Sequence, residues 1–124
     1  MEINFIGGIN IAMKIPSEKY QETVAFYRDI LLFDVEEVDV HYPPVLETHR
    51  LCFGANILWL DRVKDLTVSE IWLELATRDI NSATNYLQAN DITTCNGEKQ
   101  TIQSDVLRIK DPAGNILLMK TSSI

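Results

Sequence analysis

Hydrophobic and polar residues alternate in the first part of the chain. From residue 9 to residue 15, apolar side chains occupy every second position. A period of two is typical of a strand with one buried face. Pro16 and Ser17 predict the end of this strand and the start of a helix, with Ser17 as its N-cap. Spacings of four, three and four then predict one packed helical face, formed by Tyr20, Val24, Tyr27 and Leu31.

Short extended segments follow the first helix. A strand is predicted at 33–38, and Pro43-Pro44 forces a loop after it. Two further runs, 47–53 and 57–63, are joined by a short Gly-Ala-Asn connection that is typical of a hairpin. A polar connector comes next.

The second half repeats this order of elements. A strand is predicted at 71–76, followed by an Asp79 cap and a helix with one apolar face. Three extended segments follow at 92–95, 105–110 and 116–121, with a turn at 111–115 before the last. The letters Asn-Ile-Leu recur at residues 56 and 115, an offset of 115 − 56 = 59, and the early strands match at an offset of 62. Self-similarity of this kind indicates an internal repeat.

The repeat predicts an α+β fold of two paired βαβββ modules. Their strands would form a curved mixed sheet around a concave cavity, with the helices outside. At 124 residues the chain has room for one domain, with module 1 at about 8–63, a connector at about 64–70 and module 2 at about 71–121. Pockets form on concave faces. Strand alternation nominates the inward positions: Asn10, Ala12, Lys14, Ile57, Trp59, Asp61, Trp72, Glu74, Ile116, Leu118 and Lys120.

Composition narrows the choice of partners. Eleven basic residues against eighteen acidic ones give a net charge of −7, with no basic cluster, so nucleic acid is not expected as a partner. Neither a signal peptide nor an apolar run long enough to cross a bilayer is recognisable, which predicts a cytoplasmic protein without membrane contact. Cys52 and Cys95 show no CxxC spacing and are interpreted as reduced packing residues. His41 and His49 are interpreted as solvent-facing rather than metal-binding.

Three segments together resemble a known family. They are NIAMKIPSEKYQETVAFYRDILLFDV (10–35), the hairpin LCFGANILWL (51–60) and the closing KDPAGNILLM (110–119). This pattern resembles the vicinal oxygen chelate superfamily, which includes glyoxalase I, extradiol dioxygenases, fosfomycin-resistance transferases and bleomycin-resistance proteins. The resemblance covers about residues 8–121 and implies the paired-module fold and a homodimer. Leu32 and Asp91 depart from it, since they stand where the family usually has glycine at the helix ends.

A second departure concerns the metal site. Metal-dependent members of this superfamily hold a divalent ion with His and Glu at positions that correspond here to Asn10, Trp59, Trp72 and Leu118. Of these only Asn10 offers an oxygen, whereas such ions need several converging donors. We therefore expect no metal and no other cofactor.

Tryptophan at two of these positions suggests a different use of the space. Indole rings stack on planar or cationic ligands, and Asp61 and Glu74 could accept hydrogen bonds from a positive group. The alternative is that Trp59 and Trp72 are core residues that fill a vestigial cavity. Lys14, Lys120 and Arg108 are rim charges, inward partners of Asp61 and Glu74, or outward solubility residues.

The sequence thus favours a metal-free protein that binds a planar or cationic small organic molecule. The predicted ligand-binding residues are Asn10, Trp59, Asp61, Trp72, Glu74 and Leu118. No catalytic residue is predicted, because no nucleophile elbow, phosphate loop or dinucleotide fingerprint occurs. Two alternatives remain open. One is a metal-dependent lyase, dioxygenase or thiol transferase, and the other is an interaction module with a collapsed cavity.

Overall fold

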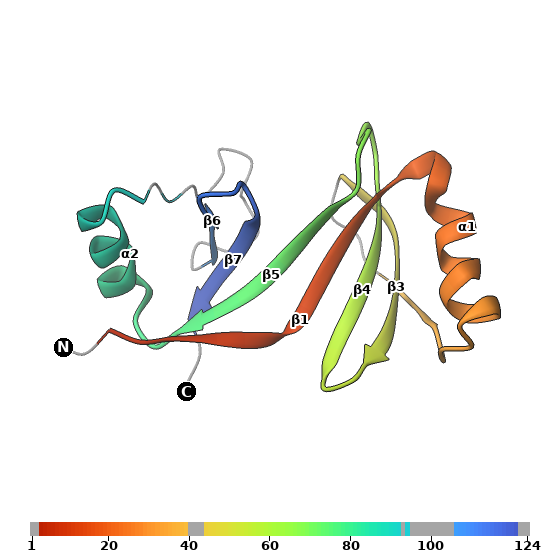
Figure 1. Ribbon diagram of the computed structural model, residues 1–124, viewed down its shortest axis with the longest axis horizontal. Coiled ribbons are helices and arrows are strands. Elements are labelled where there is room, and N and C mark those ends of the chain that lie inside the picture. The colour runs from red at the N-terminus through yellow and green to blue at the C-terminus, as the bar shows by residue number, and fades with distance from the viewer. Residues whose placement is uncertain (1–2, 40–43, 93, 95–105, 122–124) are drawn as a thin grey trace. The chain divides into compact units, whose positions relative to one another are not determined.

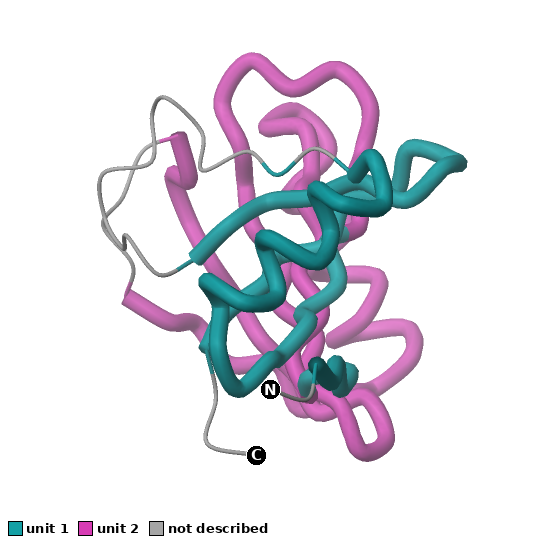
Figure 2. The backbone as a smooth tube through the Cα atoms, turned by 90° about the vertical axis from the view of Figure 1, so that its left-hand side faces the viewer, with its two compact units in different colours: residues 1–8, 72–124 teal, residues 9–71 magenta. Residues whose placement is uncertain are grey.

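The computed structural model describes residues 3–39, 44–92, 94 and 106–121. The chain forms two compact units, coloured in Figure 2: unit 1 comprises residues 1–8 and 72–124, and unit 2 comprises residues 9–71. Each unit combines an α-helix with strands that pair in both parallel and antiparallel fashion. The predicted α+β class is therefore confirmed.

Unit 2 is organised around a central parallel pair of strands. Its strands are β1 (Phe5–Pro16), β2 (Glu36–Val38), β3 (Val45–Phe53) and β4 (Asn56–Val63), of which β1 begins in unit 1. β4 pairs in parallel with β1 and antiparallel with β3, and β3 pairs antiparallel with β2. The predicted hairpin is confirmed, since Gly54 takes the left-handed φ of +65° in the turn between β3 and β4. β2 is shorter than predicted and begins at Glu36.

The helical segment of unit 2 differs from the prediction at both ends. It consists of η1 (Ser17–Lys19), α1 (Tyr20–Ala25) and the π-helical turn η2 (Phe26–Ile30). The predicted N-cap is wrong, because Ser17 lies inside the first turn and its hydroxyl accepts a hydrogen bond from Arg62 Nε at 2.7 Å. The wider π turn changes the angular position of the following residues, and Leu31 is 46% exposed instead of packed.

The core of unit 2 lies between α1 and one face of its strands, as Figure 1 shows. Ile11, Met13 and Ile15 of β1 and Leu58 and Leu60 of β4 all belong to this core. Side chains alternate across a strand, so the residues between them lie on the opposite face. The predicted alternation is confirmed for β4 and for β1 from Ile11 onward, whereas Ile9 is 55% exposed and does not join the core.

Unit 1 repeats the arrangement with a shorter helical segment. Its elements are β5 (Glu70–Thr77), which begins in unit 2, α2 (Ile80–Ala89), β6 (Val106–Lys110) and β7 (Ile116–Thr121). β7 pairs in parallel with β5 and antiparallel with β6. The predicted extended segment at 92–95 includes residues 93 and 95, which lie outside the described residues.

A predicted helix cap and a predicted turn of unit 1 are both confirmed. The Asp79 side chain caps α2 by accepting hydrogen bonds from Asn81 N at 3.0 Å and Ser82 N at 3.3 Å. These bonds, led by that of Ser82, hold the pKa of Asp79 below its usual value. The turn before β7 is closed by Asp111, whose carboxylate accepts bonds from Ala113 N and from the backbone and side-chain nitrogens of Asn115.

Leu32 and Asp91 follow the helical segments of their respective units with left-handed backbones. Their φ angles are 65° and 64°. This conformation strains a residue that has a Cβ, which explains why glycine is usual at this point.

We expect Leu32→Gly to raise the free energy of unfolding by up to about 1 kcal/mol. Removing the Cβ relieves left-handed strain of about 1–2 kcal/mol, and the greater freedom of glycine in the unfolded chain offsets part of the gain. Leu32 is 78% exposed, so little packing is lost. Urea unfolding measures the difference. Leu31→Gly is the control and should destabilise, because the φ of Leu31 is −86°; equal effects of both substitutions would contradict the strain argument.

Candidate functional site

In unit 2, Trp59 lies on the face of β4 that points away from the helix-side core. Its indole Nε1 donates a hydrogen bond to Asn10 Oδ1 at 2.7 Å. The guanidinium carbon of Arg50 lies 5.4 Å from the centre of its ring. This distance is within the range of a cation–π contact. Three strands thus contribute one polar cluster to this face.

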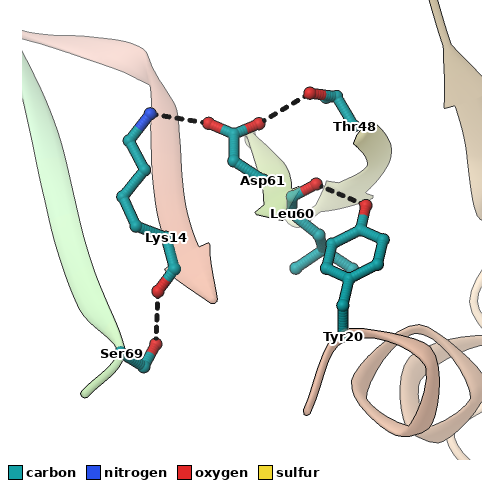
Figure 3. Close-up of polar contacts among 6 residues, drawn as sticks. All are labelled: Lys14, Tyr20, Thr48, Leu60, Asp61 and Ser69. Atoms are coloured by element: carbon teal, nitrogen blue, oxygen red, sulfur yellow. Dashed lines mark hydrogen bonds and ion pairs between the residues drawn. The ribbon is translucent and has the colours of Figure 1, made fainter. Parts of the chain in front are cut away.

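Asp61 lies on the same face of β4 but is fully engaged within the fold. Only 4% of the residue is exposed. Its Oδ2 pairs with Lys14 Nζ at 2.7 Å and its Oδ1 accepts a hydrogen bond from Thr48 Oγ1 at 3.0 Å, as Figure 3 shows. Both carboxylate oxygens therefore already have protein partners. The sequence alternative in which Lys14 pairs inward with Asp61 is the one that the structure adopts.

A cavity of about 860 Å³ opens beside this cluster in unit 2. Its strand side consists of Ile57 of β4, three residues of β3 (50–52) and Glu36 of β2, and residues 32–35, between η2 and β2, contribute the rest. Cavities of this size are typical of small-molecule sites. The full set of lining residues is Leu32, Phe33, Asp34, Val35, Glu36, Arg50, Leu51, Cys52 and Ile57. Glu36 Oε1 accepts a bond from Arg50 Nε at 3.0 Å, which fixes the guanidinium beside the opening.

Most of these lining residues were not predicted, although the hairpin contains a signal for two of them. If the hairpin turns between Phe53 and Asn56, the register of the two strands is fixed. This register pairs Arg50 with Trp59 and Cys52 with Ile57, as the structure does. Paired residues share a face. The inward assignment of Trp59 therefore also assigns Arg50. The contribution of the segment before β2 leaves no comparable pattern in the sequence.

In unit 1, Trp72, Glu74, Leu118 and Lys120 lie on β5 and β7. Glu74 is the residue opposite Leu118, and its Oε2 pairs with Lys120 Nζ at 2.7 Å. The carboxyl group also lies over Gly8, where an added Cβ would be 2.6 Å from Glu74 Cδ. Gly8 therefore leaves the space that this side chain fills. The inward pairing of Lys120 with Glu74 is confirmed as one of the sequence alternatives.

The predicted site residues divide evenly between the two units. Asn10, Trp59 and Asp61 belong to unit 2, and Trp72, Glu74 and Leu118 belong to unit 1. In each unit an arginine covers a tryptophan ring, since the guanidinium carbon of Arg108 lies 5.6 Å from the ring centre of Trp72.

Known structures with similar folds share this arrangement of elements. Methylmalonyl-CoA epimerase from Mycobacterium tuberculosis matches with a TM-score of 0.63 at 12% identity, covering 95% of this chain and 89% of that one. A glyoxalase/bleomycin resistance protein/dioxygenase superfamily member from Vibrio splendidus matches with a TM-score of 0.54 at 13% identity, covering 90% and 96%. The chain has the vicinal oxygen chelate fold. The Mn(II)-bound glyoxalase from Novosphingobium aromaticivorans has a TM-score of 0.60 at 12% identity, and this chain covers 38% of its length with 91% of its own.

Sequence comparison adds no further assignment. No protein-family model matches the sequence, and no curated protein matches it. The resemblance to the vicinal oxygen chelate superfamily that the motifs suggested is thus supported by structure, at identities of 11–17%.

The donor set does not fit the divalent ion of metal-dependent vicinal oxygen chelate proteins. Of the four corresponding residues, Trp59, Trp72 and Leu118 have no ligand atom for such an ion, and Asn10 Oδ1 already accepts the Trp59 hydrogen bond. No group of three His, Cys, Asp or Glu side chains suited to a metal occurs among the described residues.

Two other sequence interpretations change with the structure. Cys52 is exposed at the cavity and is not a packing residue, while Cys95 lies outside the described residues. His49 is not solvent-facing, since its Nδ1 lies 2.8 Å from the Tyr20 hydroxyl, and His41 also falls outside the described part of the chain. Within that part, no helix has the length and apolar character needed to cross a bilayer.

Proposed function

We propose that the protein binds a planar, neutral or cationic organic molecule in the cavity of unit 2 without a metal ion. The observation that carries this proposal is the position of the Trp59–Arg50 stack beside a cavity of about 860 Å³. The guanidinium lies over the indole ring and also lines the cavity. Planar ligands stack on guanidinium groups as well as on aromatic rings.

The charges of the cavity support the class of ligand. Asp34 and Glu36 contribute two negative charges and Arg50 one positive charge, so the lining carries a formal charge of −1. Apolar side chains from Leu32, Phe33, Val35, Leu51 and Ile57 provide the contact surface. In the proposal Asn10 and Asp61 hold Trp59 and its strand in place. The other predicted binding residues, Trp72, Glu74 and Leu118, belong to unit 1 and do not line this cavity.

The planar cation proflavine is the probe for this site. We expect it to quench tryptophan fluorescence saturably, and Glu36→Gln to weaken its binding about tenfold, because a charge-assisted contact of about 1.4 kcal/mol is lost. Trp59→Leu should weaken binding by a similar factor, since it removes the base of the stack. Fluorescence titration gives each dissociation constant.

Glu18→Gln is the matched control for this titration. Glu18 is an exposed carboxylate on η1 that does not line the cavity, so this variant should bind like the unmodified protein. Proflavine should also slow the reaction of Cys52 with a thiol reagent in a Cys95→Ser background. Equal weakening by Glu18→Gln and Glu36→Gln would show a non-specific charge effect and would contradict the proposed site.

The alternative is a metal-dependent enzyme. Its support is that the proteins of similar fold include an epimerase, a glyoxalase and dioxygenases. Elemental analysis of protein purified without chelators separates the two functions. Stoichiometric Mn, Fe, Ni or Zn would overturn the metal-free proposal. If no planar molecule shifts the melting temperature of the protein, the interaction module with a collapsed cavity is favoured instead.

We also propose a homodimer, which rests on the resemblance to the superfamily. Apolar side chains exposed at the end of the helical segment of unit 2, such as Ile30 at 68%, are available for contact. Light scattering coupled to size-exclusion chromatography should give twice the mass of one chain.

A further inference from the structure

A second cavity, of about 420 Å³, lies in unit 1 at the place that corresponds to the cavity of unit 2. Arg108 lines it and is opposite Leu118 of β7, as Arg50 is opposite Trp59 of β4. Asp91 lines it with the same left-handed backbone as Leu32. The internal repeat therefore extends to the cavities themselves.

The two equivalent arginines differ in their partners. Arg50 is held by the carboxylate of Glu36 at 3.0 Å. In the described part of the chain Arg108 has no carboxylate partner, and its contact is with the ring of Trp72. A half-buried guanidinium that pairs with no carboxylate of the described residues favours an anion, and its planar fork binds a carboxylate through two parallel hydrogen bonds.

The other charges at the second cavity do not compensate Arg108. Both oxygens of Asp111 accept hydrogen bonds from its own turn, and these bonds, led by that of the Asn115 side chain, lower the pKa of Asp111. Asp91 and Lys110 are exposed to solvent and have opposite charges. Arg108 is thus the partly buried cation of this lining, beside the apolar side chains of Ile92, Ile109 and Pro112.

We propose that the cavity of unit 1 is a separate site for a small organic anion, namely a carboxylate joined to a flat apolar group. The carboxylate pairs with Arg108, and the flat group lies against the apolar lining. The site differs from that of unit 2 in the charge it selects, so each can fail without the other.

Benzoate is the probe, with benzyl alcohol and benzylamine as neutral and cationic analogues of similar size. The chain has two tryptophans, so its ¹⁵N NMR spectrum contains two indole signals, assigned with Trp72→Phe. We expect benzoate to shift the Trp72 signal saturably, and Arg108→Gln to weaken its binding at least about tenfold. Lys110→Gln, at an exposed position, should weaken it less and reduce its salt dependence.

Arg50→Gln is the matched control, because it removes the equivalent arginine from the other cavity. Benzoate affinity should be unchanged in this variant. The proposal is overturned if benzoate leaves the Trp72 signal in place, if folded Arg108→Gln binds it as tightly as the unmodified protein does, or if benzyl alcohol binds equally well. If Arg108→Gln does not fold, the three ligands are compared on the unmodified protein. The proposal is then overturned if benzyl alcohol or benzylamine binds as tightly as benzoate.

Discussion

Replacing Asp61 by alanine is expected to lower the free energy of unfolding by about 3–5 kcal/mol. The side chains of Lys14 and Asp61 are only 13% and 6% exposed, and their charged atoms are 2.7 Å apart. Removing the carboxylate leaves the ammonium of Lys14 in a largely desolvated place and deprives the hydroxyl of Thr48 of its acceptor. The cost therefore comes mainly from the unpaired charge that remains.

A double-mutant cycle tests this explanation. Lys14→Met should destabilise the protein by a comparable amount, and Lys14→Met with Asp61→Leu should cost much less than the sum of the single changes. Urea unfolding of the four proteins gives the coupling. Glu22→Ala breaks the exposed pair with Lys19 and serves as control, with little expected change. Additive single effects at Lys14 and Asp61 would contradict a role for the pair.

Replacing Tyr20 by alanine is expected to lower the free energy of unfolding by about 3–5 kcal/mol. Tyr20 is fully buried and is among the largest side chains of the core. Its hydroxyl donates to Leu60 O at 2.7 Å and, having one proton, accepts from His49 Nδ1 at 2.8 Å. Tyr20→Phe keeps the ring and should cost about 1–3 kcal/mol, because the buried carbonyl of Leu60 and the partly buried ring of His49 lose their partner. Denaturant unfolding of both variants separates packing from hydrogen bonding, and equal losses would contradict this division.

The ionisation of Tyr20 adds a dependence on pH to the same variants. Burial, with the nearby charges of Glu47 and Asp61, raises the pKa of Tyr20 well above its usual value of about 10. The folded state therefore holds this proton more tightly than the unfolded chain does. Its contribution to stability is complete below pH of about 10 and is lost as the pH rises through the higher folded pKa. Stability should fall more steeply above that pH in the unmodified protein than in Tyr20→Phe.

The sequence predicted correctly those strands, caps and turns whose geometry depends on residues close to one another in the chain. The alternation from Ile11 to Ile15 identified a buried strand face because a half-buried strand leaves that signature directly, whereas Ile9, which continues the same alternation, is exposed. Asp79 identified the start of α2, since its carboxylate caps the following amides. The turn closed by Asp111 is likewise made by bonds among neighbouring residues.

Features that depend on distant partners could not be predicted in this way. Ser17 has the character of an N-cap, but Arg62, 45 residues away, engages its hydroxyl instead. The π turn of η2 has no period of its own in the sequence, so Leu31 was assigned to the wrong face. The stacking of Arg50 on Trp59 follows from the hairpin register, whereas the wall formed by residues 32–36 depends on tertiary packing.

The parallel pairing of β1 with β4 has a consequence for the order in which unit 2 folds. The first paired residues, Asn10 and Ile57, are 47 positions apart, whereas β3 and β4 are joined by a tight turn. Closing the longer loop costs more chain entropy and is slower. The hairpin can therefore form early as a local nucleus, and docking of β1 completes the core beneath Tyr20. Asn10 lies on β1, so its hydrogen bond with Trp59 of β4 can form only once β1 has docked on the hairpin, and the cluster beside the cavity of unit 2 depends on that docking.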